Sequence, residues 1–389
     1  MSQPTITILH SIDRLRAIAD AWDDLWSRSG VTMPTARAEL VAQWYEQFAA
    51  NKTFRAVIVE QDGRLTAAIA LVGKQIGPLV EAAALPSNEW SPCGELLLDE
   101  ATDVLATLDV LVAALDELPW PLLWLSAVPI QTARWRLLLE AVDRRGLAAD
   151  YHERFQIGLL QTSAEWEGRQ ASWSKNHRHT MKKAIRNLEA DGFRFRIESN
   201  GTPDQVQQAL MRGFEVEDRS WKGELGTSIL RSAGMTDYFV KQAQQLAEWG
   251  QLELAWIERN DGPIAFEYAW NAKRIYHSFK VGYDPKFARW SPGQSLLYYL
   301  LREFHGDASH SAIDCLGPIS PAIERWKPST YTIGRLVIAP RRLLGRMLVY
   351  AYKHIWPHVR QLRGQRETTK PRQPNQSSEP ASCPSPTSY

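Results

Sequence analysis

Hydrophobic residues in the first half of the chain follow two spacings that separate helices from strands. Apolar residues recur three and four positions apart in four segments, which predicts helices over residues 12–28, 36–50, 102–118 and 132–145. Alternating or continuous short apolar runs predict strands over residues 5–10, 54–61, 65–73, 122–127 and 151–160. The pair Asp62-Gly63 lies between two of these strands and favours a tight hairpin there.

The second half repeats this order of elements. Helical spacing predicts helices over residues 165–190, 203–221, 235–249 and 294–304. Strands are predicted over residues 193–198, 252–258, 264–271, 274–283 and 311–316. Each half therefore reads as helix, helix, hairpin, strand, helix, strand, which indicates two copies of one fold. We expect an α+β protein with domains at residues 1–163 and 164–340, then a basic helix at 341–366 and a disordered tail at 367–389.

Composition limits the class of protein and its compartment. The chain has 389 residues, of which 44% are hydrophobic and 23% charged, as in a globular protein. Its net charge of +1 gives no general field for nucleic acid, so no nucleic-acid partner is expected. The three cysteines lie far apart and His177 and His179 point in different helical directions, so no metal site is expected. Without a secretory signal or an apolar run of about 18 residues, we expect a cytoplasmic protein.

A strand, loop and helix over residues 274–304 carry the clearest candidate site. The strand ends before Asp284-Pro285, a basic loop follows with Lys286 and Arg289, and Ser291-Pro292-Gly293 opens the helix. Free backbone N–H groups and the positive end of the helix dipole attract anions at such a helix start. The pattern is neither a nucleotide P-loop nor a dinucleotide fingerprint. It does predict an anion site at the start of this helix.

This loop resembles the pyrophosphate loop of GNAT-fold acyltransferases, with Arg289, Gly293 and Ser295 at the spaced positions. Four ordered segments resemble the CelD/BcsL-type branch of that superfamily: residues 173–183, 217–223, 262–265, and Tyr283-Asp284 with 291–293. The resemblance covers about residues 165–338 and implies two tandem GNAT-like domains, the first of them degenerate. It also implies transfer from acetyl-CoA or another acyl-CoA in extracellular polysaccharide or envelope assembly, including cellulose biosynthesis. The related Fem peptidyltransferases imply a different donor, aminoacyl-tRNA, and a non-catalytic partner of a polysaccharide synthase is a third possibility.

The resemblance also implies where the cofactor binds. Pantetheine would pair with the main chain of the strand that precedes the loop, and the backbone after Trp290 would hold the phosphates. The expected cofactor-binding residues are Phe279, Val281, Arg289, Ser291, Gly293, Gln294 and Ser295.

Acyl transfer needs a group that removes the acceptor's proton, and four side chains are candidates. Glu217 and Asp218 close a predicted helix, and Glu267 lies within an apolar strand that would raise the pKa of a carboxyl group. The alternation of the strand is equally compatible with a Glu267 that faces water. Tyr283 is a candidate proton donor to the departing thiolate.

The acceptor is expected to be a small-molecule or lipid-linked sugar. Arg178, Lys182 and Arg186 share one helical face, where like charges repel each other unless an anion lies opposite. We therefore expect Arg178 and Lys182 to bind the acceptor, together with Trp221 and Lys222 of the second segment of the resemblance at residues 217–223. A solvated basic helix face is the alternative.

The segment at residues 341–366 contains no Asp or Glu. Its apolar stripe includes Leu343, Leu344, Met347 and Leu348, and Arg341, Arg342, Arg346 and Lys353 flank that stripe. This pattern is typical of a helix on an anionic membrane surface and is equally compatible with packing against the domain. Peripheral contact with the inner face of the membrane is therefore a possible addition to a cytoplasmic location.

Overall fold

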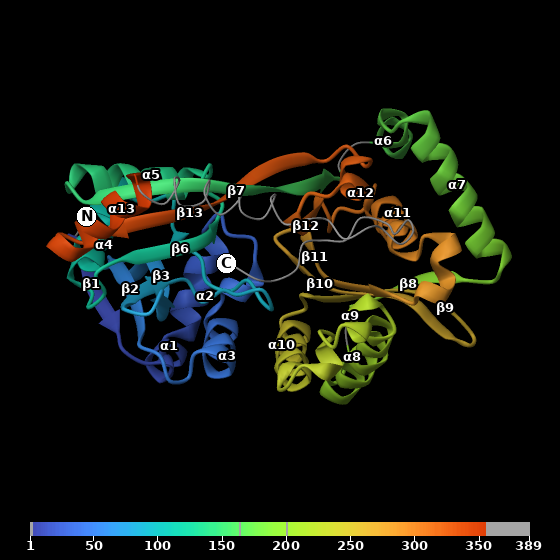
Figure 1. Ribbon diagram of the computed structural model, residues 1–389, viewed down its shortest axis with the longest axis horizontal. Coiled ribbons are helices and arrows are strands. Elements are labelled where there is room, and N and C mark those ends of the chain that lie inside the picture. The colour runs from blue at the N-terminus through green and yellow to red at the C-terminus, as the bar shows by residue number, and fades with distance from the viewer. Residues whose placement is uncertain (1–2, 163–164, 200, 355–389) are drawn as a thin grey trace, which may run out of the picture.

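The computed structural model describes residues 3–162, 165–199 and 201–354, and Figure 1 shows two lobes joined by long strands. The elements of the first half are β1 (Thr5–Leu9), α1 (Ile12–Ala17), α2 (Ala19–Arg28), η1 (Pro34–Ala36), α3 (Ala38–Phe48), β2 (Phe54–Gln61), β3 (Arg64–Ile76), β4 (Val80–Ala84), β5 (Leu97–Leu98), α4 (Val104–Glu117), β6 (Leu123–Val128), α5 (Ala133–Arg144) and β7 (Ala148–Gln161).

The second half continues the same alternation of helices and strands. Its elements are α6 (Trp166–Ser172), α7 (Lys175–Ala190), β8 (Arg194–Glu198), α8 (Pro203–Asp218), α9 (Trp221–Glu224), η2 (Ile229–Arg231), α10 (Met235–Glu248), β9 (Leu252–Arg259), β10 (Gly262–Ala272), β11 (Ile275–Tyr283), η3 (Pro285–Trp290), α11 (Pro292–Phe304), β12 (Ala312–Pro318), α12 (Pro321–Glu324), β13 (Ser329–Ala339) and α13 (Leu343–His354).

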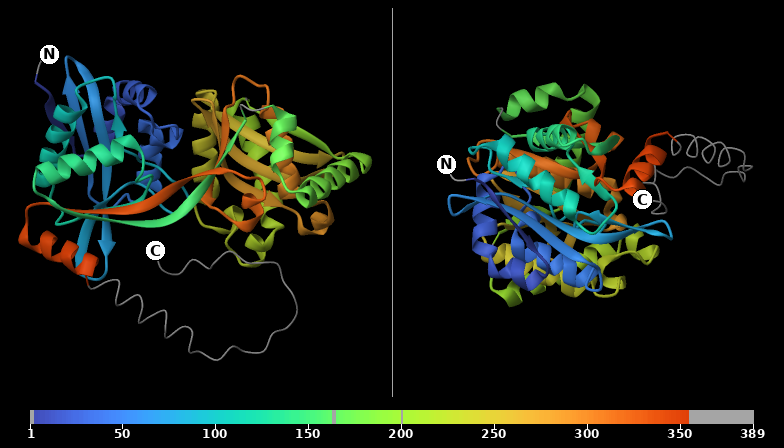
Figure 2. Two further views of the ribbon diagram at one scale, coloured as in Figure 1. Left: turned by 90° about the horizontal axis from the view of Figure 1, so that it is seen from above. Right: turned by 90° about the vertical axis from the view of Figure 1, so that its left-hand side faces the viewer.

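One mixed sheet of 13 strands runs through both lobes. The order is β1-β2-β3-β4-β6-β13-β7-β12-β11-β10-β9-β8, and β5 pairs with β3. Most neighbouring pairs are antiparallel, whereas β4–β6 and β11–β12 are parallel. Helices flank this sheet in both halves (Figure 1 and Figure 2), so the expected α+β fold with two tandem, mostly antiparallel units is confirmed.

The long strands β7 and β13 connect the lobes. β13 pairs with β7 along its whole length and with β6 of the first half, although it comes from the end of the chain. The end of β7 pairs with β12 of the second half. The sheet of the first lobe is therefore completed by a strand from inside the expected second domain, while the boundary near residue 163 stays a prediction.

The single helix expected over residues 165–190 is wrong, because the chain forms α6 and α7 there. Trp173 and Ser174 have extended backbone, and the Ser174 hydroxyl caps α7 by accepting a hydrogen bond from His177 N. Arg178 donates to the carbonyl oxygens of Ala171 and Trp173 at the end of α6. The Ser174 cap thus begins α7 as a separate helix.

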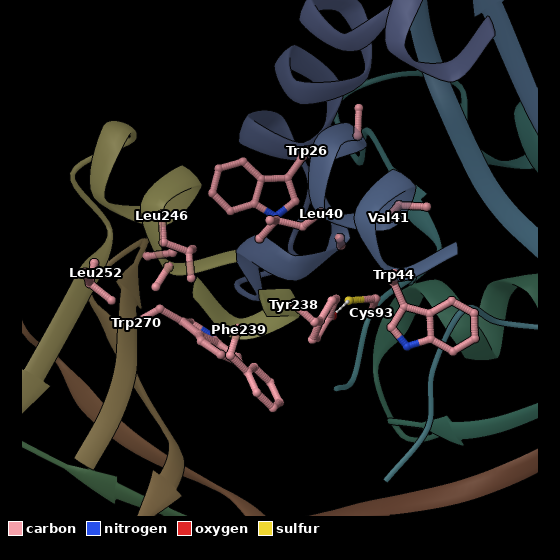
Figure 3. Close-up of a cluster of buried hydrophobic side chains, with 14 of the residues drawn as sticks. Trp26, Leu40, Val41, Trp44, Cys93, Tyr238, Phe239, Leu246, Leu252 and Trp270 are labelled. Carbon is pink, nitrogen blue, oxygen red and sulfur yellow. Dashed lines mark hydrogen bonds between the residues drawn. The ribbon is translucent and has the colours of Figure 1, made fainter. Parts of the chain in front are cut away.

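Helices from the two lobes share a hydrophobic core. Trp26, Trp44, Tyr238 and Trp270 belong to one buried cluster that joins α2 and α3 to α10 and β10. Figure 3 shows these side chains meeting between the two sets of helices. Because this apolar contact fixes one lobe against the other, a loop of the first lobe is able to take part in a site on the second.

The far end of the described chain is α13, which covers the first part of the expected basic helix. Residues 355–366 and the expected disordered tail at 367–389 lie outside the described residues. Among the helices of the described ranges, none combines the length and apolarity needed to cross a bilayer.

Candidate active site

The parallel strands β11 and β12 pair for only three residues and then diverge. The pairs are Ile275–Ala312, Tyr276–Ile313 and His277–Asp314. Beyond them β12 stays beside β7, where Pro318 pairs with Ile157, whereas β11 continues to Tyr283 beside β10. We call the region where the two strands no longer pair the gap. Along the gap the β11 edge has no strand partner among the described residues, and such an edge is able to pair with an extended ligand.

The N-terminus of α11 lies at the open end of this gap. Ser291 has a left-handed backbone with φ of 49°, and its side chain makes no cap. Pro292 has no N–H, and Ser295 N already donates to Ser291 O. The free donors of the first turn are therefore the backbone N–H groups of Gly293 and Gln294, beside the Tyr283 ring. This geometry suits an anion.

Three of the side chains expected to bind cofactor already contact other residues of the protein. Ser295 is buried and its hydroxyl donates to Trp290 O over 2.9 Å. Gln294 Oε1 accepts from Trp326 Nε1 over 2.8 Å, and Arg289 stacks on Trp290 and lies 3.7 Å from an Asp191 oxygen. In this structure the backbone of the loop, more than its side chains, is available to a ligand.

Helices cover both faces of the strands around the gap. α7 and α11 pack on one face, which we call the α11 face, and α8 and α10 pack on the other, the α8 face. Phe279 packs on the α8 face among Phe239, Tyr268 and Trp270. Val281 projects on the α11 face, and its side chain is partly exposed.

Glu267 is a buried carboxyl group on the α11 face of β10. It is 3% exposed, and its Oε1 has no hydrogen-bond partner among the described residues. Burial raises the pKa of Glu267 to about 7, although the hydroxyls of Ser278 and Tyr276 act in the opposite direction. Glu267 also helps to raise the pKa of the Cys315 thiol on β12, so its charge acts across the gap. A carboxyl group of this kind is suited to exchange protons near neutrality.

Glu217 lies on the α8 face and is held by two donors. Lys222 Nζ donates to its Oε1 over 2.6 Å, and Ile229 N donates to its Oε2 over 3.0 Å. Lys222 Nζ is also 3.4 Å from the carbonyl oxygen of Val281. A Cβ at Gly282 would lie 2.8 Å from the Cα of Glu217, so only glycine lets α8 approach β11 this closely.

Asp218 and Tyr283, the other candidates for proton transfer, differ from Glu267. Hydrogen bonds from Arg231 and Ser228 lower the pKa of Asp218, which makes this carboxylate a weak base. Tyr283 closes β11 and is partly exposed near Gly293. Of the three carboxyl candidates, Glu267 has the environment that a general base requires.

The sequence reasoning missed Lys280, which lies on the α8 face of β11. Burial lowers the pKa of Lys280 to about 7, Lys222 lowers it further and Glu217 acts against this. Its Nζ lies 4.5 Å from the Phe279 ring and 5.5 Å from that of Trp90. The only signal in the sequence was a lysine within the aromatic strand at 275–283.

Trp90 comes from the loop of the first lobe at residues 87–94. This loop docks on α10, where Gln242 Nε2 donates to the Ser91 hydroxyl over 3.2 Å. The site on the α8 face therefore contains residues from both lobes.

The four expected acceptor residues do not come together. Arg178 and Lys182 lie on α7, on the α11 face, and Arg178 is engaged with the carbonyls that end α6. Trp221 and Lys222 lie on α9 beside α8, and Trp221 is 52% exposed. A hollow of about 470 Å³ between α3, α8 and α10 contains none of them.

Comparisons with known proteins concern the second half of the chain and the overall fold. Residues 175–327 match the family model described as Acetyltransferase (GNAT) domain. No curated protein sequence matches the chain.

Solved structures of the same fold extend over both lobes. FemX superposes on the chain with a TM-score of 0.57 at 10% identity, over 85% of this chain and 96% of its own. A conserved protein from Bacteroides thetaiotaomicron gives a TM-score of 0.54 at 13% identity, over 86% and 100%. L-PGS from Bacillus licheniformis gives 0.50 at 12% identity, over 86% and 95%. The chain thus shares its two-lobed fold with these three proteins.

Proposed function

We propose that this GNAT protein transfers an acyl group, most simply acetyl, from acyl-CoA to an amine or hydroxyl acceptor at the gap between β11 and β12. The observation that carries this proposal is Glu267, a buried carboxyl group with a pKa near 7. It lies beside a strand edge that leads to an uncapped helix N-terminus. The family match supports the reaction class.

The cofactor would follow the free edge of β11. Its diphosphate would accept hydrogen bonds from the backbone N–H groups of Gly293 and Gln294. Exposed Arg289, Arg325 and Lys327 lie in the segments around this helix start and supply positive charge. The pantetheine amides would then pair with the β11 backbone, which brings the thioester into the gap near Glu267.

The transfer itself needs one proton removed and one supplied. The acceptor nitrogen or oxygen attacks the thioester carbonyl, a new C–N or C–O bond forms and the C–S bond breaks. Glu267 takes the proton that the acceptor loses, and the departing thiolate takes a proton from Tyr283 or water. Atoms and charge balance without any further reactant.

The acceptor would enter from the α8 face, where Lys222, Lys280 and Trp90 lie together, and its attacking atom would reach through the gap to Glu267 on the α11 face. An aromatic ring beside two amines suits a polar molecule with an anionic part. We propose, from the resemblance to CelD/BcsL-type proteins, a sugar or lipid-linked precursor of an envelope polysaccharide.

Thermal unfolding with and without cofactor tests this proposal. Acetyl-CoA or CoA at 100 times its dissociation constant should stabilise the protein by about 2.7 kcal/mol, whereas ATP should not. Gly293→Trp fills the space over the helix start and should abolish the shift. Gly168→Trp is the matched control, because nothing lies within 4 Å of a Cβ at that position in α6. Equal shifts in both variants would contradict binding at α11.

A Fem-like aminoacyl transferase is the second candidate, because FemX shares the fold over both lobes. It predicts no stabilisation by any CoA species and aminoacyl transfer from charged tRNA. A non-catalytic partner of a polysaccharide synthase would bind CoA without turnover. The thermal measurement and a thiol-release assay together separate the three.

A further inference from the structure

The helix α13 packs on the sheet with one narrow face. Gly345 and Val349 are buried there, and a Cβ at Gly345 would lie 2.2 Å from Pro121 O. The Tyr352 ring packs edge-on against Trp124 with centroids 5.2 Å apart. These contacts fix which side of α13 faces the protein, and therefore which side faces outward.

The outward side of α13 is apolar. Leu343, Leu344, Met347 and Tyr350 are 76%, 54%, 62% and 64% exposed. The stripe seen in the sequence is thus divided, because Leu348 is partly buried beside Val349 while these four side chains stay exposed. A surface helix normally turns polar residues outward, so this arrangement indicates a partner.

The turn between β3 and β4 extends the apolar surface. Leu79 at this turn is 90% exposed, and it lines a hollow of about 250 Å³ together with Leu344 of α13. Two segments far apart in sequence therefore present large apolar side chains at one surface. We call Leu79 and the four outward residues of α13 the apolar patch.

Basic side chains border this patch. Arg341 contacts Asp116, and Arg342 donates to the carbonyl oxygens of Leu118 and Pro119, so these two arginines anchor the start of α13. Arg346 and Lys353 are exposed and form no ion pair within the described residues. The nearby acids are Asp116, which is paired with Arg145 and Arg341, and Glu81, which lines the same hollow.

We propose that the apolar patch docks on an anionic lipid surface. An apolar helix face bordered by Arg and Lys inserts its side chains at the lipid interface, while the charges contact acidic headgroups. A second copy of this chain is a poorer fit, because a twofold contact would bring the same basic border against itself. The inference does not depend on the transferase activity.

Co-sedimentation of the full chain with lipid vesicles tests the proposal. The chain should bind phosphatidylcholine vesicles that contain phosphatidylglycerol, bind pure phosphatidylcholine weakly, and dissociate as salt rises. Leu343→Ser/Met347→Ser/Tyr350→Ser should abolish binding. Arg346→Glu/Lys353→Glu should weaken it about tenfold or more. The control Leu105→Ser changes an exposed leucine on α4 and should bind like the unaltered chain.

Three outcomes would overturn the proposal. The first is a chain that does not bind vesicles containing phosphatidylglycerol. The second is a triple serine variant that folds, by circular dichroism, and binds as the unaltered chain does. The third is a chain that does not bind vesicles and forms a dimer, as seen by light scattering, whereas the triple serine variant is a monomer. This result would assign the patch to a second copy.

Discussion

Lys222 Nζ lies 2.6 Å from Glu217 Oε1 and 3.4 Å from Val281 O, so one side chain joins the end of α8 to the free edge of β11. Glu217 is buried, and the backbone of α8 at this residue lies against Gly282. The helices on the α8 face are therefore held directly to the strand that we expect to carry the thioester. This contact makes Glu217 a positioning residue for β11.

Lys222→Met should destabilise the protein by roughly 1–3 kcal/mol, because it leaves a buried carboxylate with only the Ile229 N–H as a donor. Urea unfolding measures this loss. The double variant Lys222→Met/Glu217→Gln should recover part of it, since the amide carries no charge. Lys241→Met, at an exposed position of α10, is the control, and an equal loss there would contradict the role of the pair.

Gly282→Ala tests the close approach of α8 to β11. A methyl group 2.8 Å from the Cα of Glu217 forces the helix away from the strand, and we expect a loss of about 1–3 kcal/mol. Gly168→Ala in α6 meets nothing within 4 Å and should be neutral or slightly stabilising. Denaturant unfolding of both variants gives the comparison, and similar stabilities would show that the approach is not tight.

Glu267 gives the stability a specific dependence on pH. Its folded pKa of about 7 lies above the ordinary glutamate pKa of 4.5, so the folded state binds a proton more tightly than the unfolded state. Stability therefore falls as pH rises from about 4.5 to about 7, by roughly 3 kcal/mol if this group acts alone. Glu267→Gln should remove this pH dependence. Compared with the unaltered protein, the variant should therefore be most stable above pH 7. The prediction would be contradicted if the free energies of unfolding of the two proteins changed with pH in the same way over this range.

His310 should affect stability with the opposite sign. Burial alone would lower the pKa of His310, but its contacts with Glu253 over 3.0 Å and with Asp307 over 2.7 Å outweigh burial and raise the pKa. The stabilisation is full below the unfolded value of 6.5 and is lost as pH rises through the higher folded value. His310→Gln should therefore lower the free energy of unfolding most near pH 6 and least near pH 9. The exposed His179→Gln is the control, and a cost for His310→Gln that does not change with pH would refute the ion pair.

Much of the fold was predictable because it depends on local spacing. The Asp62-Gly63 hairpin, the strand at 275–283 and the helix after Ser291 all follow from residues close together in the sequence. The return of β13 to the first lobe was not predictable, because its partners β6 and β7 come from earlier and distant parts of the chain. The short strands β4 and β5 were missed as well, since runs of two to five residues have little periodicity.

The candidate site was also only partly predictable from the sequence. The apolar setting of Glu267 could be inferred from its own strand, although only the packing of α11 shows that the carboxyl faces inward. Lys280 could not be inferred, because its environment depends on Trp90 from the other lobe. The contacts of Arg178 with the carbonyls of Ala171 and Trp173 could not be inferred either, because they depend on the break between α6 and α7, and its role in binding an acceptor stays a prediction.

The structure of the protein with acetyl-CoA bound would test the central claim most directly. The account predicts the diphosphate at the backbone N–H groups of Gly293 and Gln294, with pantetheine along β11 and the thioester in the gap beside Glu267. Acetyl-CoA bound elsewhere, or a gap that stays empty at saturating acetyl-CoA, would contradict an acyl-CoA transferase and favour a different donor.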